Sequence, residues 1–280
     1  MANPNLRIVT LNFWGKEPPL ERRFDLAIRQ LRALAPDVVC MQEVKPHDGA
    51  STADVIGDAL GMHTRYARAS SWQAGERGMA EAGEEGLALL TRTPLLEHHA
   101  LALPTRNPLD DQRILLSGRV ATDGGPIWIH TTHLNYRLDD GISREVQVDA
   151  IDASIRARGR DNTDAPQILC GDFNATPDAD EIRFLRGLTT LANRRTHFQD
   201  AWLRLHPELD GITWSSENEL TRPLRSLDLD RRIDYVFVTS RKKDGRGTVQ
   251  RCDVALVERD DGVCASDHFA VVADIQVVSS

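Results

Sequence analysis

The sequence of 280 residues predicts an α/β fold in which two mixed sheets pack face to face, with helices on their outer faces. The chain opens with a strand, a helix and a second strand. Later apolar runs follow one another closely enough to pair as hairpins, with few helices between them. This order is neither regular strand–helix alternation nor an all-strand pattern. No linker or shift in composition divides the chain, so we expect a single domain over residues 1–280.

The first half of the chain begins with two apolar runs that are typical of buried strands, "LRIVTLNF" (6–13) and "PDVVCMQEV" (36–44). Between them, apolar residues recur at helical spacing: Phe24, Ile28, Leu31 and Ala35. Residues 85–101 predict two strands that are interrupted near Pro94. Residues 113–122 and 126–134 predict a hairpin around a turn that contains two glycines.

The second half of the chain starts with a helix over 142–157, because three apolar residues share one face there: Val148, Ile151 and Ile155. "PQILCGDF" predicts the next strand, and a helix should begin near Pro177, with acidic residues in its first turn. The remaining expected strands are 231–238, 253–256 and 269–278. The expected loops are 70–85, 103–112 and 215–231.

Composition places the chain among ordinary globular proteins, with 41% hydrophobic and 27% charged residues. No apolar stretch reaches membrane-spanning length, and the first residues lack the basic segment and apolar core of a signal peptide. None of the four cysteines forms a C-x-x-C pair, which argues against a zinc site. Cys252 and Cys264 could pair, but reduced thiols and a cytoplasmic protein are favoured.

The formal net charge of −8 argues against a protein that simply coats nucleic acid, because phosphate contacts need Lys and Arg. It does not exclude an enzyme that acts on phosphates. An acidic site can hold a divalent cation, which then reverses the local field.

Polar side chains lie within or at the ends of the apolar runs in six separate segments, where they cost free energy unless they are paired. They are Asn12, Glu43, His133, Asn135, Asp172, Asn174, Asp234, Asp267 and His268. One converging site explains this distribution best. Asp172 and Asn174 share one face if their strand continues through Asn174. The alternative is a strand-to-turn exit, where Asp and Asn bond to local backbone.

The same segments carry a resemblance to a known family. "TLNFWG", "QEV", "THLNY", "GDFNATP", "RRIDYVFV" and "ASDHFAVV" are similar to the ordered motifs of the endonuclease/exonuclease/phosphatase superfamily, which has the DNase I-like fold. The motifs run from residue 10 to residue 272, so the resemblance covers almost the whole chain. It implies a four-layer α/β/β/α sandwich with its site at one end of the two sheets. It also implies hydrolysis of a phosphoester that depends on a divalent metal.

The resemblance also assigns roles at the metal and at the attacking water. Glu43 matches the principal metal ligand, and Asn12 and Asp267 match its helpers at the same Mg²⁺ or Mn²⁺ ion. Asp172 matches the carboxylate that orients or deprotonates water, and Asn174 matches the amide beside the scissile phosphate. This fits the general chemistry, since Mg²⁺ prefers oxygen ligands and often binds through one or two carboxylates.

On the phosphate side, His268 matches the catalytic histidine and Asp234 the acid that pairs with it. Asp234 would fix the tautomer of His268 and favour its charged form. His133 matches a phosphate-binding histidine of the branch that includes sphingomyelinases, deadenylases and tyrosyl-DNA phosphodiesterases. Abasic-site endonucleases generally have a tyrosine near that place, so abasic-site repair is disfavoured.

The leading hypothesis is a metal-dependent phosphodiesterase, with a small-molecule or lipid diester favoured as substrate. Four residues are candidates for binding the substrate: Trp14, Asn135, Arg222 and Arg225. The alternative is a nuclease or a DNA-end-processing phosphodiesterase, for which nucleic acid is the substrate. A non-catalytic binding domain of the same fold is a third possibility, but Glu43, Asp172, Asp267 and His268 are all retained. No obligate protein partner is evident.

Overall fold

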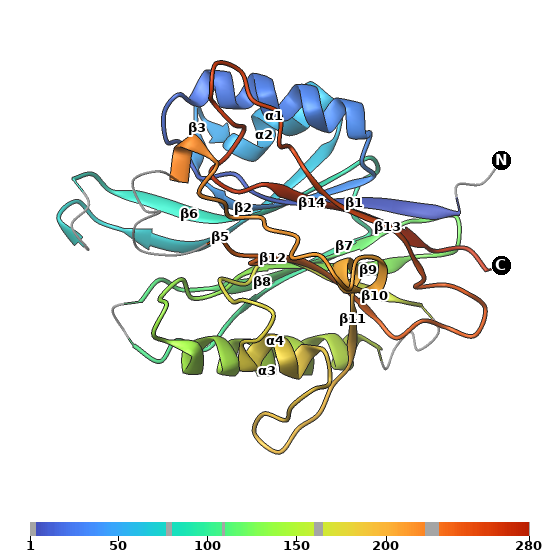
Figure 1. Cartoon of the computed structure of the whole chain (residues 1–280). Helices are drawn as coiled ribbons and strands as arrows, with labels where there is room; N and C mark the ends of the chain where they lie inside the picture. Colours follow the sequence, from blue (N-terminus) through green and yellow to red (C-terminus); the bar gives the residue numbers. More distant parts are fainter. Residues whose placement is uncertain (1–3, 77–79, 108–109, 160–164, 222–229, 280) are drawn as a thin grey trace.

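The computed structural model describes residues 4–76, 80–107, 110–159, 165–221 and 230–279. Two six-stranded sheets pack face to face, and helices cover the outer face of each (Figure 1). This is the four-layer α/β/β/α sandwich that the sequence predicts. The fold expectation is therefore confirmed.

The first sheet has the strand order β13-β14-β1-β2-β6-β5. Its strands are β1 (Asn5–Asn12), β2 (Val38–Val44), β5 (His63–Trp72), β6 (Gly83–Thr91), β13 (Val249–Ala255) and β14 (Ala270–Gln276). β1 and β2 run parallel, and the other neighbours run antiparallel. Helices α1 (Leu20–Leu34) and α2 (Thr52–Leu60) cover its outer face (Figure 1).

The second sheet has the strand order β11-β12-β10-β9-β8-β7. Its strands are β7 (Glu97–Ala102), β8 (Ile114–Val120), β9 (Ile127–His133), β10 (Gln167–Asp172), β11 (Phe198–Asp200) and β12 (Asp234–Thr239). β9 and β10 are its parallel pair. Helices α3 (Gly141–Gly159) and α4 (Asp180–Leu185) lie against its outer face (Figure 1). Four short elements complete the described chain: β3 (Pro46–His47), β4 (Ala50–Ser51), α5 (Ala201–Leu205) and the 3₁₀ turn η2 (Glu219–Thr221).

Three apolar clusters hold these layers together. One lies between the sheets and includes Ile8, Ile129 and Ile168. The second packs α1 and α2 onto the first sheet, and the third packs α3 and α4 onto the second sheet. The inner cluster buries alternate residues of both sheets, as face-to-face sheet packing requires.

Several elements depart from the expectations. Part of the expected loop 70–85 is strand, because β5 continues to Trp72 and β6 begins at Gly83. β5 shows little burial along its length, so it lacks the alternation of apolar residues that marks a strand. α2 was not expected either, although Ser51 and Asp54 form a capping box at its start. α4 begins at Asp180 rather than near Pro177. All four cysteines are free and buried, which confirms the expectation of reduced thiols.

Candidate active site

The two parallel strand pairs bring the predicted site residues to one end of the sandwich. Asn12 ends β1 and Glu43 lies near the end of the neighbouring β2. His133 ends β9 and pairs with Asp172, which ends β10. Because parallel strands end on the same edge of a sheet, these four side chains lie together.

The antiparallel neighbours add the remaining groups to the same end. β12 starts where β10 stops, so that Asp234 is the register partner of Asp172. Asp267 and His268 lie two to three residues before the start of β14, which is antiparallel to β1. The structure therefore brings together eight of the twelve residues predicted for the site: Asn12, Glu43, His133, Asp172, Asn174, Asp234, Asp267 and His268.

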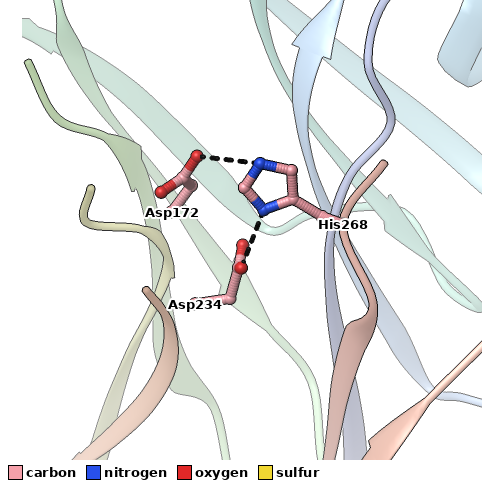
Figure 2. Close-up of side chains that lie close together, drawn as sticks. All are labelled: Asp172, Asp234 and His268. Carbon is pink, nitrogen blue, oxygen red and sulfur yellow. Dashed lines mark hydrogen bonds and ion pairs between the residues drawn. The ribbon is translucent and has the colours of Figure 1, made fainter. Parts of the chain in front are cut away.

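His268 lies between two carboxylates (Figure 2). Its Nδ1 bonds to Oδ2 of Asp234 at 2.9 Å, and its Nε2 is 3.8 Å from Oδ2 of Asp172. Burial alone lowers the pKa of His268, but the carboxylates of Asp234, Asp267 and Asp172 outweigh it and raise the pKa well above its ordinary value. His268 is therefore a buried imidazolium whose orientation is fixed by Asp234.

Asp172 lies at the centre of the site. Its Oδ2 accepts a hydrogen bond from the Asn12 amide at 3.0 Å and lies 3.4 Å from Nε2 of His133. Burial, followed by the nearby Asp234, raises the pKa of Asp172 to about 7, although His268 acts in the opposite direction. A carboxylate with this pKa can take up a proton near neutral pH.

The acidic side of the site is formed by Glu43 and Asp267. Glu43 has a left-handed backbone (φ 54°) where the pairing of β2 with β6 shifts register, and this turns its side chain toward Asn12. Burial raises the pKa of Asp267 to about 6, and the charge of Glu43 contributes to that rise. Two carboxylates so close together favour a proton or a cation between them.

His133 is buried, and its pKa lies well below the ordinary value, because burial and then the positive charges of Arg113 and His268 disfavour its charged form. It is therefore a neutral imidazole at the edge of the site. A neutral ring still provides one N–H donor.

Asn174 does not extend the strand. β10 ends at Asp172, and Asn174 has φ 51°, so the same-face argument based on a continuing strand does not apply. The backbone N–H of Asn174 donates to Asp172 at 2.8 Å, and its side-chain amide donates to the carbonyl of Leu134 at 3.2 Å. Asn174 remains beside Asp172 through this local turn.

The predicted substrate-binding residues are placed differently. The Asn135 side chain donates to Asp110 and accepts from the backbone N–H of Arg137, so it is occupied away from the cluster. Trp14 is half-buried, and its backbone N–H donates to Oδ1 of Asn12 at 3.0 Å. Arg222 and Arg225 lie outside the described residues.

Sequence reasoning did not identify the residues that hold the loops carrying Asn12 and Asp267. Ser266 donates to the carbonyl of Asn12, and the Asn218 amide donates to the carbonyls of Ser266 and Asp267. Arg23 of α1 donates to carbonyls on both sides of the site, those of Phe13 and Ala265 among them. Ser266 lies inside the motif "ASDH", so the sequence could have identified it. Asn218 and Arg23 lie outside the motifs, and no local pattern distinguishes them.

A pocket of about 740 Å³ opens beside the acidic side of the site. It is lined mainly by the β5–β6 hairpin, including Arg68, Trp72 and Glu84, and by Lys45, which follows Glu43 by two residues. Another pocket, of about 560 Å³, lies near Gln167 and Thr239 at the opposite ends of β10 and β12, away from the site.

This fold and this cluster of carboxylates and histidines define a class of phosphoester hydrolases, and comparison with known proteins agrees. The model of the endonuclease/exonuclease/phosphatase family matches residues 9–268, so the chain belongs to that family. Human protein angel homolog 2 is 25% identical over 182 residues, which are 59% of this chain and 30% of that protein. The chain thus matches less than a third of the length of this curated relative.

Two solved structures share the fold. An endonuclease/exonuclease/phosphatase from Beutenbergia cavernae DSM 12333 superposes with a TM-score of 0.75 and 22% identity, over 99% of this chain and 72% of that chain. TDP2 from D. rerio, complexed with a single-stranded DNA product, superposes with a TM-score of 0.71 and 21% identity. That match covers 98% of this chain and 99% of the other. Among the described residues, no helix is long and apolar enough to cross a membrane.

Proposed function

We propose that this protein is a divalent-metal-dependent phosphodiesterase that directs water at a phosphodiester. The observation that carries the proposal is the continuous arrangement of Asp234, His268 and Asp172 beside the acidic pair of Glu43 and Asp267. It offers an acceptor for a proton, a fixed positive charge and a site for a cation within one buried cluster. Phosphoryl transfer needs these three things.

The acidic pair fits a hard cation such as Mg²⁺ or Mn²⁺. No described residue donates a hydrogen bond to the second oxygen of Glu43 or to that of Asp267. Asn12 points its amide nitrogen at Glu43, so coordination through its oxygen requires rotation of the amide. When bound, the cation would neutralise and polarise the phosphate.

The remaining steps belong to side chains of the chain itself. Asp172 takes the proton of the attacking water, since it is an acceptor held in place by Asn12 and by the N–H of Asn174. His268, kept charged by Asp234, donates to a phosphoryl oxygen. Neutral His133 offers its N–H to another, which supports the proposal that the protein belongs to the branch with this histidine.

We favour a small-molecule or lipid diester as the substrate, because the net charge of −8 attracts no polyanion. The pocket of about 740 Å³, whose lining includes Lys45 two residues after Glu43, can receive a substituent of the phosphate. The second candidate is a nuclease or a DNA-end-processing enzyme, since the chain has the fold of the TDP2 that was solved with single-stranded DNA product. The four buried free thiols support a cytoplasmic location.

A substrate panel with and without metal tests the proposal. Bis-p-nitrophenyl phosphate, a monoester, single- and double-stranded DNA, RNA and sphingomyelin are assayed in Mg²⁺, in Mn²⁺ and in EDTA. We expect hydrolysis of at least one diester, its loss in EDTA and its return with metal.

Glu43→Gln keeps the size of the side chain and removes its charge, so it should raise the metal concentration needed for half-maximal activity. Glu97→Gln on the exposed strand β7 is the control, and its metal requirement should match that of the wild type. Full activity of Glu43→Gln at low metal would exclude Glu43 as the main ligand.

A further inference from the structure

Four arginines are buried among the described residues: Arg23, Arg113, Arg144 and Arg232. Three of them donate at least two hydrogen bonds to described residues, although Nε of Arg232 is buried without a partner among these residues. Arg23 donates to main-chain carbonyls, Arg144 donates to Glu181 and to two carbonyls, and Arg232 donates to both oxygens of Asp200. Such hydrogen bonds offset the cost of removing a guanidinium from water.

Arg113 is the exception. It is only 5% exposed, yet its guanidinium donates no hydrogen bond to a described residue. Its nearest described anion is Oε1 of Glu85 at 3.8 Å, beyond hydrogen-bond distance, and the ring centre of Tyr136 is 6.0 Å away. A guanidinium carries five N–H donors in a planar fork. None of the Arg113 nitrogens is among the fully buried side-chain atoms that lack a partner, so its donors keep contact with solvent although the residue is nearly buried. Arg113 is therefore a nearly buried cation whose donors are available to a ligand that enters from solvent.

The position of Arg113 places it at the proposed active site. It directly precedes β8, whose first residues pair with the last residues of β9, so it lies beside His133. Its positive charge is one of the causes, after burial, that hold the pKa of His133 low. Glu85, its ion-pair partner, belongs to β6 of the other sheet, so the Arg113 side chain bridges the two sheets at the end that carries the site.

The strand order fixes the side of the site on which Arg113 lies. Across the second sheet, β12, β10, β9 and β8 follow one another and carry Asp234, Asp172, His133 and Arg113 in that order. Arg113 is thus about 10 Å, or two strand spacings, from the strand of Asp172. His133 separates it from the His268 pair, so Arg113 faces a position next to the scissile phosphate.

A second cation strengthens the local positive charge. The Lys45 side chain is half-buried and also donates no hydrogen bond to a described residue. Burial and then Glu43 raise the pKa of Glu85 to about 7, and both Arg113 and Lys45 act against that rise. Glu85 therefore faces two cations, and one carboxylate does not satisfy both.

We propose that Arg113, assisted by Lys45, binds a second phosphate group of the substrate, next to the phosphate that is cleaved. The planar fork of arginine matches phosphate oxygens in pairs, which favours it over a point charge at such a position. This inference rests on the proposed function, because it assumes that a phosphodiester occupies the adjacent cluster. It narrows the substrate to a diester that carries a further phosphate.

Two dinucleotides that differ by one group test the proposal. Dithymidine monophosphate has a single phosphate, and its 5′-phosphorylated form has a second one beside it. The wild type should hydrolyse the 5′-phosphorylated dinucleotide with a kcat/KM about tenfold or more higher than that for dithymidine monophosphate. This factor corresponds to the free energy of one charge-assisted hydrogen bond. Arg113→Met should abolish this preference, and Arg113→Lys should retain part of it.

Arg119→Met is the matched control, since Arg119 lies on the same strand near its other end and should leave the preference intact. On bis-p-nitrophenyl phosphate, which has one phosphate, Arg113→Met should lose less activity than it loses on the two-phosphate dinucleotide, whereas Arg119→Met should lose little on either substrate. An equal loss of Arg113→Met activity on one- and two-phosphate substrates would overturn the proposal, because Arg113 would then serve the scissile phosphate itself.

A binding measurement separates this inference from the proposed function. Inorganic phosphate is titrated calorimetrically into the protein in EDTA. The affinity should be about tenfold or more weaker in Arg113→Met than in Arg119→Met. Equal affinities would overturn the inference even if diesters are hydrolysed. Failure of the wild type to hydrolyse any diester would refute the proposed function, while the titration still decides whether Arg113 binds phosphate.

Discussion

At the scale of single residues, the His268–Asp234 pair is the strongest unit of the site. Oδ2 of Asp234 accepts from His268, and no described residue donates to Oδ1, although that atom is buried. Among the described residues, the Asp234 carboxylate therefore accepts its hydrogen bond from His268. Removing either partner would leave the other as a buried charge without its counter-charge, which is costly.

We therefore expect the effects of the two residues to be non-additive. His268→Ala should lower kcat on a small diester by on the order of 10² or more, within the range for acid–base groups. Adding Asp234→Asn to that variant should cost little further, because Asp234 acts through His268. The measurement is a double-mutant cycle of kcat/KM with folding checked by circular dichroism. If the two losses simply multiply, the residues act separately.

Much of the site was predictable because its residues interrupt apolar strands. Asn12, His133 and Asp172 end buried runs, where a polar group has to find a partner. The left-handed backbone of Glu43 was not predictable, since it depends on the register shift between β2 and β6. Arg113 escaped notice because only its burial and its missing partners distinguish it from the other arginines.

At the scale of elements, three strands of the second sheet share a buried polar chain. Ser117 of β8 bonds to His130 of β9 at 2.8 Å, and His130 bonds to Gln167 of β10 at 3.1 Å. Gln167 then donates to the carbonyl of Ile155 in α3. Strands with such buried polar residues are still typical apolar runs, because Ile127, Trp128 and Ile129 precede His130. The exposed β5, by contrast, shows no such run.

His130 should make the protein sensitive to acid. Burial lowers its pKa to about 3 from an ordinary 6.5, so between these values the unfolded chain binds the proton and the folded chain does not. Stability therefore falls as pH drops below about 6.5, by up to about 1.4 kcal/mol per pH unit from this group. We expect urea unfolding of His130→Gln between pH 4 and 7 to show a smaller slope than that of the wild type. An unchanged slope would mean that His130 is charged in the folded protein or remains unprotonated when unfolded.

At the scale of the whole molecule, the distribution of charge favours the proposal that phosphate binds at the site rather than along the surface. The formal net charge is −8, and several surface cations are already paired, as Arg183 is with Asp180 and Arg194 with Asp149. Arg232 is buried against Asp200, so it does not contribute to a basic surface. The described surface thus offers little for a long polyanion, whereas Arg113 and His268 offer buried positive charge at one place.

The salt dependence of substrate binding follows from this distribution. Binding that neutralises one or two phosphates should give a slope of log affinity against log salt of about −1 to −2, whereas a protein that contacts many phosphates gives a much steeper one. We expect the Michaelis constant for the best substrate to show the shallow slope between 50 and 200 mM NaCl, a range over which many contacts cost about 10³ or more. Replacing Arg222 and Arg225 by Ala should change the preference among substrates more than the turnover of bis-p-nitrophenyl phosphate. A steep slope, together with cleavage of DNA or RNA that collapses in this double variant, would instead establish the nuclease, because only a polyanion held along its backbone responds to salt in that way.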